Sequence, residues 1–170
     1  MSDFSIVSYL DQNAEYLIRV LLSAVLGFLI GLDREYKKKP AGVKTYMYVT
    51  VACTLLTIIS VESVEKYGEL NHLVRMDPLR LAAQIVSGLG FLGAGVILKD
   101  GLEIRGLTSA AMILFAGGVG IGIGAGFYGI IIFTMLIAWC LAKLGEKLER
   151  DYNLGNRRKR KRSIQKRETS

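Results

Sequence analysis

Apolar residues fall in long blocks along this chain, and three of these blocks have the length of a membrane-spanning helix. They cover residues 16–32, 46–61 and 81–98, and among their side chains only Arg19 carries a charge. A helix needs about 20 apolar residues to cross the hydrocarbon core of a bilayer. Each block therefore predicts one transmembrane helix.

The next apolar block is too long for a single crossing. From residue 107 to residue 142 the chain has 36 residues without a charge, which make ~54 Å of helix at ~1.5 Å per residue against a core of ~30 Å. The Gly-Ala-Gly segment at 124–126 permits a tight turn, so we predict two spans near 107–124 and 127–144. The sequence thus predicts an all-α membrane protein, a compact bundle of about five transmembrane helices.

Two helix starts carry the residues that favour them. Pro78 follows Asp77 and suits the first helical position of the third span. Thr108 is a natural N-cap for the fourth span.

Lys and Arg residues are unevenly distributed among the connections. The first 18 residues contain none, whereas the connection 33–45 carries five, and the segment 62–78 has two against four carboxylates. The chain beyond residue 142 is strongly basic. The positive-inside rule therefore places the N-terminus outside and the C-terminus in the cytoplasm, as five spans require.

The last part of the chain differs in composition from the rest. We expect residues 1–144 to form the transmembrane domain and residues 145–170 a basic cytoplasmic tail, whose composition indicates disorder. Residues 157–162 are six consecutive Arg and Lys residues. After a last span such a run contacts anionic lipid, and we favour this over nucleic-acid binding.

Composition excludes several classes of protein. Hydrophobic residues make up 51% of the chain and the mean hydropathy is +0.36, which an ordinary soluble domain does not reach. Cys53 and Cys140 lie in apolar blocks, which suggests free thiols and not a disulfide framework. The single histidine, His72, lies in an outer connection without a nucleophile constellation, so we expect no enzyme. The first 15 residues lack a basic n-region, so we expect no cleavable signal peptide.

Glycines at small-residue spacing predict close helix packing. Gly88-x-Gly90-x-x-Gly93 has the spacing of a dinucleotide-binding fingerprint, but no strand-helix-strand unit surrounds it. Small residues let helix backbones approach closely, and we expect the first and third spans to pack together through them. The packing glycines are Gly27, Gly31, Gly88, Gly93, Gly95, Gly118 and Gly122.

Glycines alternate through the fourth span and form two stripes at a spacing of four. These stripes are Gly118, Gly122 and Gly126, and Gly120 and Gly124. We favour packing as their role. A helix that kinks or unwinds to line a cavity, as transporter helices do, remains the alternative.

Polar residues inside the spans are the first functional candidates. Gln84 and Ser87 lie within the third span, where an amide needs an interhelical partner or water. Arg19 and Arg80 lie near the outer ends of their spans, where arginines either extend to the headgroups or serve a function.

Charged residues gather on the cytoplasmic side, at the end of the first span and before the fourth. Their carboxylates suit a hard cation such as magnesium, or they pair with the neighbouring bases. Bases are nearly as numerous as acids there, so we favour ion pairs and leave the metal open. The residues are Asp33, Arg34, Glu35, Lys44, Asp100, Glu103 and Arg105.

Three segments carry a family resemblance. "GFLIGLDREYKKKPAGVKT", "AAQIVSGLGFLGAGVILKDG" and "IRGLTSAA" resemble, in order and spacing, the signature segments of the MgtC/SapB family of bacterial membrane proteins. The match covers roughly residues 15 to 130. The resemblance implies a five-span hydrophobic domain and a short SapB-like member, without the regulatory domain that many relatives add after the last span.

The family pattern falls on particular residues of this chain. Lys44 stands where the family has an arginine and so lacks its bidentate fork, and Tyr46 replaces a common histidine. The matching positions are Gly27, Gly31, Arg34, Glu35, Ala41, Gly42 and Thr45, then Gln84, Ser87, Gly88, Gly93, Ala94 and Gly95, and last Arg105, Gly106, Leu107 and Thr108.

The resemblance also implies a physiological setting. It suggests a multi-pass protein of the bacterial inner membrane with a role in growth at low magnesium and in host survival, and inhibition of the F-type ATP synthase is proposed for some members. Two classes stay open: a regulator that binds another membrane complex, and a small transporter or channel for magnesium or another cation. Few ionisable groups lie deep in the spans, so we favour the regulator.

The expected partners follow from this interpretation. They are the lipid bilayer, a membrane protein and further copies of the chain, without nucleic acid. We expect no cofactor, with bound magnesium left open.

Overall fold

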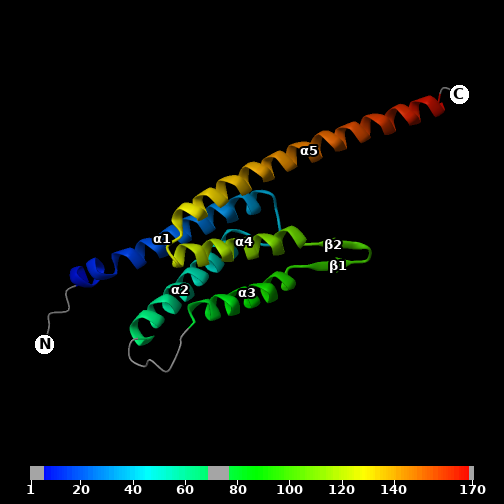
Figure 1. Cartoon of the computed structure of the whole chain (residues 1–170). Helices are drawn as coiled ribbons and strands as arrows, with labels where there is room; N and C mark the ends of the chain where they lie inside the picture. The colour runs from blue at the N-terminus through cyan, green and yellow to red at the C-terminus, as the bar shows by residue number, and fades with distance from the viewer. Residues whose placement is uncertain (1–5, 69–76, 169–170) are drawn as a thin grey trace. The chain divides into compact units, whose positions relative to one another are not determined.

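The computed structural model describes residues 6–68 and 77–168, and within them the chain forms five helices and one small hairpin (Figure 1). The chain divides into two units, residues 1–128 and 129–170. The elements are α1 (Ile6–Tyr36), α2 (Val43–Gly68), α3 (Pro78–Gly95), β1 (Leu98–Asp100), β2 (Glu103–Arg105), α4 (Leu107–Gly124) and α5 (Tyr128–Glu168).

The predicted spans correspond to the helices. Among the residues that the structure describes, four helices are long and apolar enough to cross a membrane: α1, α2, α4 and α5. The fifth, α3, has 18 residues, as many as α4, but Arg80 and Gln84 reduce its hydropathy. The prediction of an all-α membrane protein with about five helices is confirmed, and the hairpin is an addition to it.

Most helix ends follow the sequence signals. α3 begins at Pro78, as predicted. α4 ends at Gly124, and Gly126, between α4 and α5, adopts the left-handed conformation at φ 82°. The expected N-cap Thr108 is wrong, because α4 already begins at Leu107 and its N-cap is Gly106 at φ 91°.

The hairpin β1–β2 occupies the connection between α3 and α4 (Figure 1). Its strands are antiparallel, Lys99 faces Ile104 in the register, and every residue of both strands is exposed. The turn contains Gly101 at φ 60°. Because a strand of three residues shows no clear alternation, the sequence pattern indicated only a loop here.

In the first unit, α2 lies between α1 and α4 and packs against both, while α3 packs on α4 and on α2. The fully buried side chains include Tyr46 and Thr50 of α2 and Ile113 and Ile123 of α4. The expectation that the first and third spans pack together is wrong, since α1 contacts mainly α2 and α4. Small-residue spacing reveals a face suited to close packing, but it does not reveal the partner helix.

Close backbone approach explains two glycines of α1. A Cβ added at Gly31 would lie 2.5 Å from the Cα of Val43, and one at Gly27 would lie 2.9 Å from the Cα of Met47. Both neighbours belong to the first turns of α2. Only a residue without a side chain allows the two helices to approach this closely.

On α4 the structure uses one of the two predicted stripes. A Cβ at Gly124 would lie 2.7 Å from the carbonyl oxygen of Thr54, and one at Gly120 would overlap the carbonyl oxygen of Thr50. The stripe of Gly120 and Gly124 therefore allows α4 to pack closely against α2.

The other predicted packing glycines have looser surroundings. A Cβ at Gly93 would make an ordinary contact, 3.6 Å from the Cβ of Ala110 on α4. Gly88, Gly95 and Gly118 have nothing within 4 Å of such a Cβ, so close packing does not explain them in this chain alone. Gly122 accepts a hydrogen bond from the backbone N–H of Phe127 at 2.8 Å.

The second unit is the greater part of α5, which continues as one helix to Glu168. This differs from the disordered tail predicted from residue 145, because Lys, Arg, Glu and Gln favour helices and no proline interrupts them. The ammonium of Lys143 lies 5.9 Å over the ring of Trp139, one turn earlier in the helix.

Candidate functional site

Three polar side chains meet at the end of the first unit where α1 ends and α4 begins. Arg34 of α1 and Ser109 of α4 are buried, and Tyr46 of α2 is fully buried. Arg34 Nη2 lies 3.5 Å from Ser109 Oγ, and the Tyr46 hydroxyl donates to the Ser109 carbonyl oxygen at 3.4 Å. We call these three residues the inner donor cluster. The end of the first span and the start of the fourth, which the sequence assigns to the same membrane face, are in contact here through Arg34 and Ser109.

The nearby carboxylates are engaged elsewhere. Glu35 accepts a hydrogen bond from the backbone N–H of Val43 at 2.9 Å and so caps the N-terminus of α2, and a Cβ at Gly42 would lie 2.8 Å from its Oε2. Asp33 pairs with Lys37 at 2.9 Å. Lys44 is exposed.

The second group of predicted charges lies on the hairpin. Arg105 Nη2 pairs with Glu103 Oε2 at 2.8 Å, and both side chains are exposed. Asp100 faces Glu103 across the register. Thr108, in the first turn of α4, is exposed. Within residues 6–68 and 77–168, no group of three or more His, Cys, Asp or Glu side chains is arranged to hold a metal ion.

Arg19 occupies the opposite end of the first unit. Its Nη1 donates to the Gly124 carbonyl oxygen at 2.7 Å, and its Nη2 pairs with Glu15. The guanidinium therefore caps the C-terminus of α4, where the helix dipole favours a positive charge. Arg80 is exposed. His72 lies outside the described residues.

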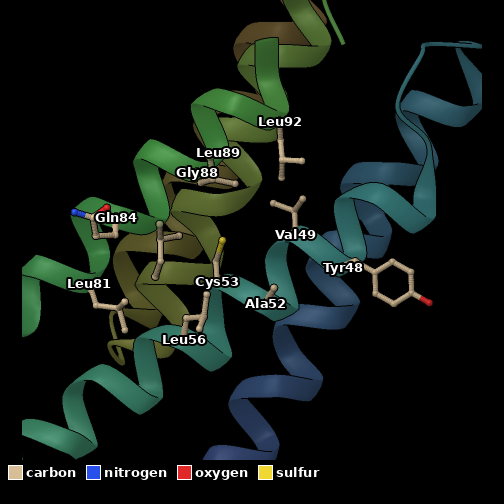
Figure 2. Close-up of a pocket in the computed structure, with 11 residues that line it drawn as sticks. Tyr48, Val49, Ala52, Cys53, Leu56, Leu81, Gln84, Gly88, Leu89 and Leu92 are labelled. Atoms are coloured by element: carbon tan, nitrogen blue, oxygen red, sulfur yellow. The ribbon is translucent and has the colours of Figure 1, made fainter. Parts of the chain in front are cut away.

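An open apolar pocket of about 510 Å³ lies between α2 and α3 (Figure 2). Cys53 and Leu56 of α2 and Leu89 of α3 line it, together with Gln84 and Gly88. Cys53 is buried, whereas Gln84, Ser87 and Gly88 are exposed. Gln84, Ser87 and Gly88 of the third span are thus exposed on α3, with Gln84 and Gly88 at the edge of this pocket, whereas Gly93 is buried beside Ala110 of α4.

Sequence reasoning missed the threonines of α2. Thr54 Oγ1 donates to the Gly120 carbonyl oxygen of α4 at 2.9 Å, and Thr50 and Thr57 donate to carbonyl oxygens of their own helix, each at 2.7 Å. All three hydroxyls are buried. Thr50, Thr54 and Thr57 are spaced by four and three residues within an apolar block, and this spacing could have identified one polar face of the helix.

The long apolar helices and their polar contacts define a polytopic α-helical membrane protein, in which buried threonine hydroxyls donate to backbone carbonyl oxygens. The chain belongs to the MgtC family, which it matches over residues 20–151. This confirms the resemblance seen in the sequence.

Named relatives support the assignment. The chain is 49% identical over 130 residues to an uncharacterized protein of Haemophilus influenzae. The aligned region covers 74% of this chain and 55% of that protein. The chain is 40% identical over 146 residues to Protein SapB of Bacillus subtilis, covering 81% and 62%. It is 36% identical over 142 residues to the "Putative magnesium transporter YhiD" of Escherichia coli, covering 81% and 63%.

The chain spans between half and two thirds of the length of these curated relatives. No solved structure matches it.

Proposed function

We propose that this protein is a regulatory module of the bacterial inner membrane that acts in magnesium homeostasis by binding another membrane protein through α3. The observation that carries this proposal is the uncovered face of α3. Gln84, Ser87 and Gly88 are exposed there, and Gly95 has nothing within 4 Å of an added Cβ.

Such a face suits a second helix better than lipid. A glutamine amide exposed to hydrocarbon lacks hydrogen-bond partners, whereas a neighbouring helix supplies them. Glycines without a covering neighbour allow that helix to approach closely. The pocket between α2 and α3 gives large side chains of the partner a place to enter.

The interior of the first unit supports regulation over transport. Residues 20–32 of α1, 46–61 of α2, 81–95 of α3 and 107–124 of α4 contain no Asp, Glu, Lys, Arg or His. The buried threonine hydroxyls already donate to backbone carbonyl oxygens. An ion path through the membrane usually needs ionisable or free polar groups at depth.

The family supplies the physiological setting of the proposal. Its name and that of the Escherichia coli relative point to magnesium. The F-type ATP synthase, which the family resemblance suggests for some members, is the first partner to test.

Ion transport is the second candidate, because the name of the Escherichia coli relative is that of a putative magnesium transporter. Purified protein in liposomes that contain a magnesium-sensitive dye separates the two candidates. The regulator predicts no flux above that of empty liposomes from a sample that is folded by gel filtration. Magnesium flux that Gln84→Leu abolishes would instead support the transporter.

Crosslinking in native membranes tests the docking face directly. In a background with Cys140→Ser, which removes the exposed native thiol, Gly88→Cys places a reactive thiol on the proposed face. Leu21→Cys, at an exposed position of α1, is the matched control. We expect Gly88→Cys to capture one partner protein that Leu21→Cys does not. Recovery of self-adducts alone, or of the same proteins from both positions, would count against the regulator.

A further inference from the structure

Arg34 carries a buried positive charge whose partner is missing. The residue is 6% exposed, and its Nε is buried without a hydrogen-bond partner. Its contact with Ser109 Oγ, at 3.5 Å, is longer than an ordinary charged hydrogen bond. In the part of the chain that the structure describes, no carboxylate lies within ion-pair distance of this guanidinium.

The position of Arg34 at the N-terminus of α4 raises the free energy of keeping this positive charge buried. Ser109 is the third residue of α4, so the guanidinium lies at the first turn of an 18-residue helix. That end of a helix carries a partial positive charge and N–H groups without intrahelical acceptors. Gly106, the N-cap, has no side chain to accept from them. Two sources of positive potential therefore converge.

The inner donor cluster as a whole has a surplus of donors. The Arg34 guanidinium donates to Ser109 Oγ at 3.5 Å and the Tyr46 hydroxyl donates to the Ser109 carbonyl oxygen at 3.4 Å, so both acceptors are neutral oxygens of one serine, while the guanidinium has further N–H groups to donate. The adjacent carboxylates are already engaged: Glu35 accepts a hydrogen bond from the backbone N–H of Val43, and Asp33 forms an ion pair with Lys37. The cluster lacks an acceptor with several oxygens.

We propose that the inner donor cluster binds a phosphate group at the N-terminus of α4, with Arg34 as the principal contact. A guanidinium matches phosphate oxygens in a bidentate geometry, and helix N-termini bind phosphate through their free N–H groups. Positive-inside orientation puts this end of the unit at the cytoplasmic headgroup level. The phosphate comes either from a phospholipid headgroup or from a free phosphate in the cytoplasm.

Arg19 provides the contrast within the same molecule. It also lies in α1 and contacts α4, but at the helix C-terminus, where Gly124 accepts its hydrogen bond at 2.7 Å and Glu15 pairs with it. That guanidinium has its acceptors, so it needs no further anion. Only the inner end of α1 presents an arginine against the positive end of α4.

Thermal unfolding of the full chain in detergent tests the site. The buffer contains gluconate as its only other anion, and the ionic strength is held constant. One arm adds inorganic phosphate. The other adds phosphatidylglycerol to the micelles, compared with a glycosyl diacylglycerol of the same tails that lacks phosphate. Arg34→Gln removes the charge, and Arg105→Gln, on the exposed hairpin, is the control.

The native chain and Arg105→Gln are expected to gain thermal stability in at least one arm, and Arg34→Gln is expected to need about tenfold or more of the same anion for an equal gain. A gain with phosphatidylglycerol alone identifies the lipid as the source, and a gain with inorganic phosphate identifies the free anion. Without either anion, Arg34→Gln should be at least as stable as the native chain, because the unpaired charge is gone.

Two results would overturn the proposal: no anion-dependent gain in the native chain, or an equal gain in Arg34→Gln. Should Arg34→Gln fail to fold, Arg34→Lys replaces it, since a lysine keeps the charge but lacks the fork. An undiminished gain in Arg34→Lys would then refute the role of the guanidinium.

Discussion

Arg19 and Arg34 show that the position of an arginine along α1 determines whether its charge is favourable beside α4. They are fifteen residues apart on α1, and their contacts on α4, Gly124 and Ser109, are also fifteen residues apart. The two helices therefore run antiparallel, and each arginine meets the opposite end of the α4 dipole. The same side chain stabilises α4 at one end and requires a counter-charge at the other.

The capping role of Arg19 predicts a loss of stability on neutralisation. Arg19→Gln should lower the free energy of unfolding by about 1–2 kcal/mol, because it removes a charged hydrogen bond to the Gly124 carbonyl oxygen. Unfolding in a denaturing detergent, followed by circular dichroism, measures the change. Arg80→Gln, at an exposed position, is the matched control and should change stability little. Equal losses in both variants would reject the capping role.

Glycines that look equivalent in the sequence should differ in their tolerance of a methyl group. Gly31→Ala should cost about 1–3 kcal/mol, because the added Cβ would lie 2.5 Å from the Val43 Cα. Gly118→Ala, with nothing within 4 Å, should be neutral or stabilising through its better helix propensity. Thermal unfolding of both variants decides, and similar melting temperatures would contradict the packing of α1 on α2.

Residue spacing predicted the roles of the α1 glycines only in part and did not reveal the role of the α2 threonines. Gly27 and Gly31 were expected to be packing residues and are, yet their partner is α2 and not the third span. The threonines of α2 went unnoticed, because a hydroxyl bonded to a carbonyl oxygen adds little to a hydropathy pattern. Spacing reports the face of a helix, while the neighbour depends on tertiary packing.

At the scale of elements, the charge-free blocks and the turn glycines located the helices, and the hairpin escaped notice. Gly106 is its critical residue, since it joins β2 to α4 at φ 91° and an added Cβ would overlap the Val96 carbonyl oxygen. The position thus combines a left-handed backbone with close contact to the end of α3.

This geometry predicts different costs for the two hairpin glycines. Gly101→Ala should cost roughly 1–2 kcal/mol, the price of a left-handed alanine in open space. Gly106→Ala should cost clearly more, because the methyl group also meets Val96. Midpoints of unfolding in denaturing detergent compare the two. A smaller loss for Gly106→Ala than for Gly101→Ala would show that the hairpin is arranged differently.

At the scale of the whole molecule, the first unit has an interior whose threonine hydroxyls are hydrogen-bonded, whereas Gln84, Ser87 and Gly88 of α3 are exposed. α2 is held between α1 and α4 by glycine contacts and threonine hydrogen bonds. On α3, Gln84, Ser87 and Gly88 are exposed, and Gln84 and Gly88 border the pocket beside α2. This contrast supports a module that is folded by itself and offers one helix face to another membrane protein.

The sequence alone could predict the membrane class and the family, because both depend on long apolar blocks and on fixed motifs. It could not assign Gln84 to an outer face, because an amide within a span is compatible with an interior partner as well as with an external one. Nor could it separate Arg34 from its neighbour Glu35, since the hydrogen bond of Glu35 depends on where α2 begins and the burial of Arg34 depends on its contact with α4.

Growth at limiting magnesium is the measurement that shows whether the function of the protein depends on the exposed face of α3. A strain that lacks the gene is complemented with the native chain, with Gln84→Leu or with Val86→Leu, an exposed residue on another face of α3. With equal amounts of protein in the membrane, we expect Gln84→Leu to lose most of the growth rescue and Val86→Leu to retain it. Equal rescue by the two variants would contradict a function that depends on this face of α3.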